Sequence, residues 1–153
     1  MSWEHFGKFM VPGEPQGKGR PRFVRATGRT YTPADTLYYE DRIAKIAALV
    51  FDDRELPIAA DVPIWLDVAA VFSRPSRLYR RKDSIERVWA PRARVDADNI
   101  IKTIGDALQR ILFKDDRQVV RATVSKEYGR IFDRKEKRGE LSHVLVNLYT
   151  WVD

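Results

Sequence analysis

The sequence predicts an α+β fold in which two helices pack on a mixed or antiparallel sheet. Two segments carry apolar residues at helical spacing, and four others are rich in β-branched and aromatic residues that alternate with polar ones. Their order is strand, helix, strand, helix, strand, strand, which is typical of helices packed against one sheet. The chain has 153 residues, no internal repeat and no linker-like stretch, so we expect one domain over residues 1–153.

The first strand is expected at residues 6–11, where apolar and polar residues alternate. Residues 12–22 follow as a basic loop, because their prolines and glycines interrupt regular structure. The first helix is expected to end near residue 52. Its start is predicted at Thr32 as the N-cap, with Pro33 at N1 and an aspartate at N3 completing a capping box.

Residues 62–72 are rich in β-branched and aromatic side chains and predict the second strand. The next segment, residues 74–94, is dense in arginine and has only Asp83 and Glu86 as opposing charges. We interpret it as a mobile basic loop, with a solvated surface as the alternative. Trp89 lies within it and is a candidate for stacking on an unpaired base.

The second helix is expected at about Asp98 to Leu112, where one apolar stripe repeats at helical spacing. Residues 114–117 predict a turn, and residues 118–126 predict the third strand. Residues 128–140 are a charged turn region, and residues 141–151 alternate enough to form the final strand.

The composition narrows the classes of function. The chain has 28 lysines and arginines against 22 acidic residues, a net charge of +6, which favours a polyanionic partner such as nucleic acid. It has no cysteine, which excludes disulfides and thiolate sites. No apolar run approaches the roughly 20 residues of a membrane span, and the start lacks a secretion signal. We therefore expect a cytoplasmic protein with no membrane association.

Acidic residues gather just before and within the second helix. If residues 94–97 are extended, Asp96 and Asp98 point the same way and converge at the end of a strand. Lys102 lies one helical turn beyond Asp98. The alternatives are that Asp98 only caps the helix and that Lys102 only supports it through Asp98. For Asp106, one turn further on, the alternative is a solvent-facing ion pair with Lys102 or Arg110.

A third carboxylate comes from Asp115-Asp116, in the turn after the same helix. Asp116 reaches Asp96 only if the strand after it lies beside the strand that carries Asp96, and we expect that pairing. The alternative is a solvated turn, for which adjacent aspartates are common.

Two or three carboxylates at one point repel each other unless a cation lies among them. Ligand sets made only of oxygen suit Mg²⁺ or Mn²⁺. Zinc is disfavoured, because there is no cysteine and the only two histidines, His5 and His143, are far apart in sequence. Mg²⁺ held by carboxylates commonly serves phosphoryl transfer.

The stretch from Asp96 to Lys126 resembles the RusA family of Holliday-junction resolvases. The family pattern is Asp-x-Asp-Asn-x-x-Lys, an Asp four residues later, and Asp-Asp-x-Gln before a strand that ends in Lys. Here it is carried by Asp96-Ala97-Asp98-Asn99-Ile100-Ile101-Lys102, Asp106, Asp115-Asp116-Arg117-Gln118 and Lys126. The N-terminal half is also similar, at Val11-Pro12-Gly13, Lys18 to Arg22 and Thr32-Pro33.

The resemblance implies a RusA-like fold and a Mg²⁺-dependent endonuclease, with Mn²⁺ as a substitute, that resolves four-way DNA junctions by symmetric nicks in recombination and repair. It implies Asp96, Asp98 and Asp116 as catalytic metal ligands, Lys102 as a fourth catalytic residue, and Asp106 and Asp115 as further acidic positions. It also implies a homodimer encoded by a phage or prophage in a bacterial cell. The cations expected to contact DNA are Lys18, Arg20, Arg22, Arg80, Arg81, Lys82, Arg92, Arg94 and Lys126.

The chain departs from the family pattern in three places. Many members have proline before the first aspartate, where this chain has Val95, and many have an Asn-Gly-type turn after Asp-Ala-Leu, where this chain has Gln109-Arg110. Shorter members also lack much of residues 74–94. Two other functions stay open: a broader nuclease for flaps or branched DNA, and a non-catalytic DNA-binding protein of phage origin. Three aspartates beside Lys102 favour catalysis, because carboxylates would repel the phosphates that a simple binder must hold.

Overall fold

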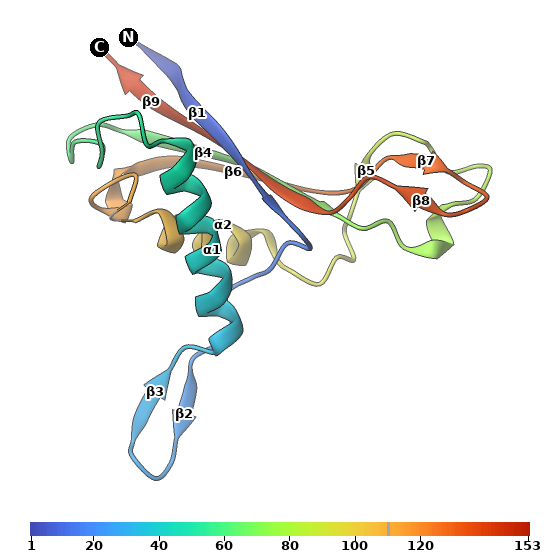
Figure 1. The fold of residues 1–153 in the computed structure, drawn as a ribbon, viewed down its shortest axis with the longest axis horizontal. Coiled ribbons are helices and arrows are strands. Elements are labelled where there is room, and N and C mark those ends of the chain that lie inside the picture. The colour runs from blue at the N-terminus through green and yellow to red at the C-terminus, as the bar shows by residue number, and fades with distance from the viewer. Residues whose placement is uncertain (110) are drawn as a thin grey trace.

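In the computed structural model, which describes residues 1–109 and 111–153, a five-stranded mixed sheet carries two helices (Figure 1). The sheet strands are β1 (Ser2–Pro12), β4 (Ile64–Phe72), β5 (Val88–Trp89), β6 (Val119–Tyr128) and β9 (His143–Val152). The helices are α1 (Ala34–Val50) and α2 (Ala97–Leu108). Two small hairpins join β2 (Arg22–Val24) to β3 (Arg29–Tyr31) and β7 (Ile131–Asp133) to β8 (Arg138–Gly139). The predicted α+β fold, with two helices on a mixed sheet, is confirmed.

The strand order in the sheet is β1-β9-β4-β6-β5. The central pair β4 and β6 is parallel, whereas β9 is antiparallel to both β1 and β4. A parallel pair needs a crossover connection, and α2 lies in the chain between β4 and β6. The topology therefore returns the residues after α2 to the middle of the sheet.

The hydrophobic core lies between one face of the sheet and both helices. Alternate residues of β4, from Ile64 to Ala70, are buried, as the alternating pattern predicted. They join one cluster with the buried faces of the helices, which include Ile43 of α1 and Ile104 of α2. The opposite face of the sheet carries a ladder of aromatic rings, in which Trp65 stacks on Tyr149 with centroids 4.5 Å apart.

The start of α1 differs from the prediction. Pro33, with φ −54° and ψ 143°, is the N-cap and makes no side-chain capping bond, so the predicted Thr32 cap is wrong. The extended ψ of Pro33 places Ala34 as the first helical residue. The Pro33 carbonyl accepts from the Thr36 and Leu37 amides, which satisfies two of the free N–H groups of the first turn.

The end of α2 also differs from the prediction. The helix stops at Leu108, four residues before the predicted Leu112, because Gln109 turns to an extended conformation with ψ 136°. Leu112 and Phe113 are fully buried, although they lie outside the helix. The apolar residues that extended the prediction to Leu112 are core residues, but they lie in an irregular turn after the helix.

Three short pairings lie in segments that the sequence predicted as loops. The β2–β3 hairpin follows the expected basic loop, β5 lies within residues 74–94, and the β7–β8 hairpin lies within the expected turn at residues 128–140. Each of these strands has only two or three residues, too few for an alternating pattern to be recognised.

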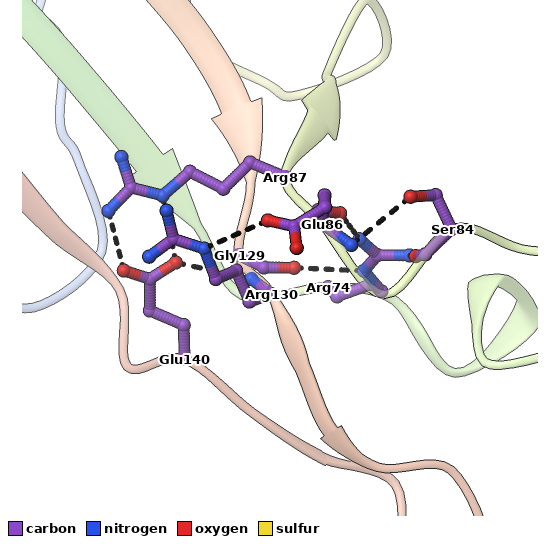
Figure 2. A network of polar contacts seen from close by, with 7 residues as sticks. All are labelled: Arg74, Ser84, Glu86, Arg87, Gly129, Arg130 and Glu140. Carbon is purple, nitrogen blue, oxygen red and sulfur yellow. Dashed lines mark hydrogen bonds and ion pairs between the residues drawn. The ribbon is translucent and has the colours of Figure 1, made fainter.

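Segment 74–94 is tied to the β7–β8 hairpin by a buried arginine. Arg74 is 6% exposed, and its guanidinium donates hydrogen bonds to four backbone carbonyls, three of which are drawn in Figure 2. The four acceptors are Leu78, Ser84, Glu86 and Gly129. The planar guanidinium can donate to several acceptors at once. Arg74 therefore has a structural role in the lobe that segment 74–94 forms with the β7–β8 hairpin. The mobility of the segment stays a prediction.

Candidate functional site

A glycine–lysine–glycine segment passes close to the starts of both helices. A β-carbon at Gly17 would lie 2.7 Å from Val95 Cγ1, just before α2. One at Gly19 would lie 2.6 Å from Thr36 Oγ1 in the first turn of α1, where the Gly19 amide donates a 2.9 Å hydrogen bond to that hydroxyl. Only residues without a side chain fit these approaches, so Lys18 is held between the two helices.

Lys18 bridges one carboxylate from each helix. Its Nζ donates a hydrogen bond to Asp106 of α2 and lies 3.8 Å from Glu40 Oε1 of α1. The hydrogen bond to Asp106 raises the pKa of Lys18, so the ammonium group stays charged at neutral pH. Asp106 therefore pairs with Lys18 and not with Lys102; Arg110, the other partner that the sequence offered, lies outside the described residues.

Glu40 is a site residue that the sequence analysis did not single out. Its side chain is 18% exposed, and burial raises the pKa of its carboxyl group. The 3.8 Å separation from Lys18 is too long for a hydrogen bond, and Oε1 has no hydrogen-bond partner among the residues that the structure describes. The signal was a glutamate between Thr36 and Ile43 on the buried stripe of α1.

An open pocket beside this bridge collects charged residues of both signs from three parts of the chain. Its polar lining consists of Lys18 and Arg20 from the loop, Asn99, Lys102 and Asp106 from α2, and Asp116 from the turn before β6. The crossover topology brings Asp116 back to α2. Two of the predicted catalytic residues, Lys102 and Asp116, therefore lie in one pocket.

Asp116 begins a short 3₁₀ turn, Asp116–Gln118, in the place of the turn predicted at residues 114–117. The Asp115 carboxylate caps this turn by accepting from the Arg117 amide at 2.8 Å and from the Arg117 guanidinium. These side-chain hydrogen bonds hold the pKa of Asp115 well below its usual range. Asp115 therefore shapes the turn, and it is Asp116 that lines the pocket.

Gln118 fixes the same turn from the buried side. It is 5% exposed, and both the oxygen and the nitrogen of its side-chain amide form hydrogen bonds. Oε1 accepts from the amides of Lys114 and Asp115, while Nε2 donates to the Ala59 carbonyl at 2.8 Å. A buried amide with its hydrogen bonds made gives the turn one conformation, which sets the direction of the Asp116 backbone.

Asp96 and Asp98 lie at the start of α2, and both are exposed. Asp96 is at the N-cap position without a side-chain capping bond, and Asp98 is in the first turn. The prediction of an extended stretch over residues 94–97 is wrong, because the helix begins at Ala97. The expected strand pairing is wrong as well: Asp96 belongs to no strand, and β6 pairs with β4 and β5.

The three predicted metal ligands do not form one group in this structure. Asp116 lines the pocket, whereas Asp96 and Asp98 lie outside its lining, with Asp98 one turn from Lys102 along α2. Within residues 1–109 and 111–153, no three His, Cys, Asp or Glu side chains lie close enough together to hold a metal ion. The donor type, carboxylate oxygen only, is nevertheless that of a hard divalent cation.

The cations predicted to bind DNA fall into separate places. Arg20 and Arg22 are exposed next to the pocket, where the chain leaves for the β2–β3 hairpin. Arg92 and Arg94 line a second pocket together with Arg77, between the end of β4 and the segment that leads to α2. Arg92 and Arg94 therefore line a pocket of their own and not the pocket that holds Lys102 and Asp116.

The remaining predicted DNA contacts lie elsewhere. Arg80, Arg81 and Lys82 belong to the lobe with β7 and β8, where Arg80 forms an ion pair with Asp83 at 3.2 Å (Figure 1). Lys126 donates to the Ala93 carbonyl at 3.1 Å and so holds the segment that leads into α2. The structure therefore does not bring these four residues to the pocket.

Neither helix in residues 1–109 and 111–153 is long and apolar enough to cross a membrane.

The pocket combines two lysines and an arginine with two carboxylates in an open setting. Such a site can hold an anionic ester through its cations while Asp116, unlike Asp106 with its Lys18 partner, remains available for a metal ion or a water molecule.

Comparison with known proteins agrees with this chemistry. The family model of endodeoxyribonuclease RusA matches residues 12–134, which include the loop, both helices and the turn of Asp116. The uncharacterized protein YqaN of Bacillus subtilis (strain 168) is 32% identical over 127 residues, which cover 80% of this chain and 87% of that protein. The chain therefore belongs to the RusA family of DNA endonucleases, which act on Holliday junctions.

Proposed function

We propose that this protein resolves four-way DNA junctions by Mg²⁺-dependent hydrolysis of one phosphodiester bond per subunit. The observation that carries the proposal is the pocket in which Lys102 of α2 and Asp116 of the turn before β6 lie beside Lys18 and Arg20. Family membership supports a junction endonuclease. The pocket supports the chemistry, because cations and carboxylates face the same open space.

The cations of the pocket would hold the scissile phosphate. Two lysines line the pocket, Lys102 from α2 and Lys18 from the loop. Lys18 is oriented by Asp106, so its position is set before DNA arrives. A cation placed in advance stabilises the charge that develops on the phosphate without rearrangement.

The carboxylates of Asp96, Asp98 and Asp116 would hold the metal ion. All three are exposed, and none forms an ion pair among the residues that the structure describes. Bound Mg²⁺ would supply Lewis-acid polarisation of the phosphate and a more acidic water. As they stand the three side chains are not gathered around one point, so rotation of exposed side chains has to accompany metal binding.

A homodimer would make two such pockets act on one junction. A four-way junction has near two-fold symmetry, and a two-fold dimer places one pocket on each of two equivalent strands. Paired nicks at symmetric positions then follow from the symmetry of the complex, without a further specificity element. The expected role in recombination and repair is part of the same proposal.

Cleavage of a labelled four-way junction tests the proposal, with linear duplex, flap and single-strand controls. We expect paired symmetric nicks in the junction with Mg²⁺ and none with EDTA. Asp116→Asn should reduce cleavage by at least 10²-fold while junction binding is kept, because the pocket cations remain. Asp61→Asn removes an exposed carboxylate outside the pocket and should cut at the wild-type rate.

Other outcomes decide between the alternatives. Cutting of flaps and single strands at the same rate would replace the junction resolvase with a broader nuclease. Junction binding without cleavage under Mg²⁺ or Mn²⁺ would leave a DNA-binding protein and overturn the catalytic proposal.

A further inference from the structure

The chain from Pro15 to the start of the first helix carries positive charges only. Residues 15–34 contain Lys18, Arg20, Arg22, Arg25 and Arg29, and no aspartate or glutamate. Lys18 is used in the pocket, as described above. The four arginines lie on or beside the β2–β3 hairpin, so this hairpin concentrates positive charge without any local compensation.

The hairpin projects from the body of the protein. Figure 1 shows β2 and β3 extending away from the sheet, between the loop that carries Lys18 and the start of α1. Every residue from Arg20 to Tyr31 is exposed. A four-residue turn closes the hairpin, and Gly28 there adopts a φ of +67°, the left-handed region that favours glycine.

The arginines of this hairpin have no acidic partners in the protein. Among the residues that the structure describes, none of Arg20, Arg22, Arg25 and Arg29 forms an ion pair. In the β7–β8 hairpin, by contrast, the arginines have partners within the protein. There Arg138 pairs with Asp133 at 3.3 Å, and Arg134 donates to the Asp83 carbonyl at 2.7 Å.

Large apolar side chains accompany the unpaired arginines. Phe23 is 63% exposed and Tyr31 is 48% exposed. In the register of the hairpin Arg22 is opposite Tyr31, and Phe23 is opposite Thr30, so the two rings lie on opposite faces. Each of these rings leaves about half or more of its surface exposed on a projecting arm, which is unfavourable unless a partner covers it.

The combination of unpaired arginines and exposed rings fits one kind of partner. Arginines bind phosphates, and aromatic rings stack on bases that are not enclosed in a duplex. Regular duplex DNA offers phosphates but hides the faces of its bases. A branch point offers both, because base stacking is interrupted where the arms meet. The hairpin is also joined directly to the pocket through Arg20.

We propose that the β2–β3 hairpin is the element that recognises the branch point. Its arginines hold the phosphates of a DNA arm next to the pocket, and Phe23 stacks on a base exposed at the crossing. This inference rests on the proposed function and deepens it, because it names the feature of the substrate that distinguishes a junction from a duplex. Phe23 would therefore determine specificity and take no part in hydrolysis.

The test compares Phe23→Ala with Phe132→Ala, a matched control on the β7–β8 hairpin. Phe132 is 70% exposed, close to the exposure of Phe23, but in its hairpin Arg138 is paired with Asp133 and Arg134 is bound to a backbone carbonyl. Binding is measured without divalent cations to a four-way junction that carries 2-aminopurine at the crossing, and to a linear duplex of the same sequence. Circular dichroism checks that each variant is folded.

Phe23→Ala should weaken junction binding about tenfold and abolish the change in 2-aminopurine fluorescence, while duplex binding is unchanged. Phe132→Ala should match the wild type on both substrates. The double variant Arg25→Gln, Arg29→Gln should weaken binding to both substrates and reduce the slope of log K against log salt by about two.

The outcomes separate this inference from the proposed function. A wild-type protein that binds and cuts junctions while Phe23→Ala behaves identically would overturn the role of the hairpin and leave the nuclease. Equal losses for Phe23→Ala and Phe132→Ala would also overturn it. A wild-type protein whose junction binding depends on Phe23, but which cuts no DNA, would support the hairpin and overturn the proposed activity.

Discussion

The contacts of Lys18 show how a side chain can favour function at the expense of stability. Its ammonium group is placed by Asp106 and Glu40, one on each helix. Glu40 is mostly buried and its Oε1 lacks a hydrogen-bond partner among the described residues. A buried carboxylate with an incomplete partner set reduces stability at neutral pH, so its presence is explained by what it does for Lys18.

Replacement of Glu40 by glutamine tests this trade-off. Because the pKa of Glu40 is raised in the folded protein, its ionised form costs stability at neutral pH. Glu40→Gln should leave the free energy of unfolding unchanged or raise it by about 1 kcal/mol. Junction cleavage at low DNA concentration should fall about tenfold, because Lys18 loses one of the two charges that place it.

The matched control is Asp41→Asn on the same helix. Asp41 is exposed and pairs with Lys45 at 2.8 Å, away from the pocket. It should lower stability by a few tenths of a kcal/mol and leave cleavage intact. A Glu40→Gln protein that is both less stable and fully active would show that Glu40 is an ordinary structural residue.

At the scale of elements, the pattern of residues predicted which segments are regular but not how the site is assembled. The alternation of β4 and the apolar stripe of α2 were sufficient to place both elements. The close passage of residues 17–19 along both helix starts was not predictable, because it depends on contacts between segments far apart in sequence. The same reason hid Glu40, whose charge has meaning only beside Lys18.

The geometry of that passage yields a prediction about Gly17. A methyl group there would lie 2.7 Å from Val95 Cγ1 and 3.1 Å from Asn99 Cβ, closer than packed atoms tolerate. Gly17→Ala should therefore displace the loop from the start of α2. We expect a loss of about 1–3 kcal/mol in stability and a larger proportional loss of cleavage, because the start of α2 carries two proposed metal ligands.

Gly105→Ala on α2 is the control for this change. A β-carbon at Gly105 meets no atom within 4 Å, and alanine favours the helix. This variant should gain about 0.5–1 kcal/mol and cut junctions normally. Thermal unfolding and cleavage assays on both variants give the comparison. Normal activity in Gly17→Ala would mean that the loop can move away without consequence.

At the scale of the whole molecule, the arginines fall into two groups: those that are paired within the fold and those that are left exposed. In the lobe of segment 74–94 and the β7–β8 hairpin, several arginines form ion pairs within the protein, as Arg87 does with Glu140 at 2.5 Å (Figure 2). The β2–β3 hairpin leaves its arginines exposed. A net charge of +6 could be counted from the sequence, but its division between the two parts required the tertiary structure.

The paired half of this division gives the protein a defined acid sensitivity. The Glu140 carboxylate accepts two hydrogen bonds from Arg87 and one from the Arg130 amide. The hydrogen bonds from Arg87 are the main cause that lowers the pKa of Glu140 to about 2, from an ordinary value of 4.5. A lowered pKa in the folded state stabilises the protein above pH 4.5, and this contribution is lost as the pH falls from 4.5 through about 2.

Glu140→Gln should therefore destabilise the protein by about 1–3 kcal/mol at pH 7, where the carboxylate is fully ionised. The difference between wild type and variant should shrink as the pH falls below 4.5 and vanish only below about pH 2, where the Glu140 carboxyl group is protonated in both the folded and the unfolded state. Urea denaturation at several pH values measures this difference. Glu136→Gln, an exposed change on the turn of the same hairpin, should give no such pH-dependent gap. A constant gap between wild type and Glu140→Gln at every pH would assign the loss to packing, and the ion pair with Arg87 would then contribute nothing to the acid sensitivity.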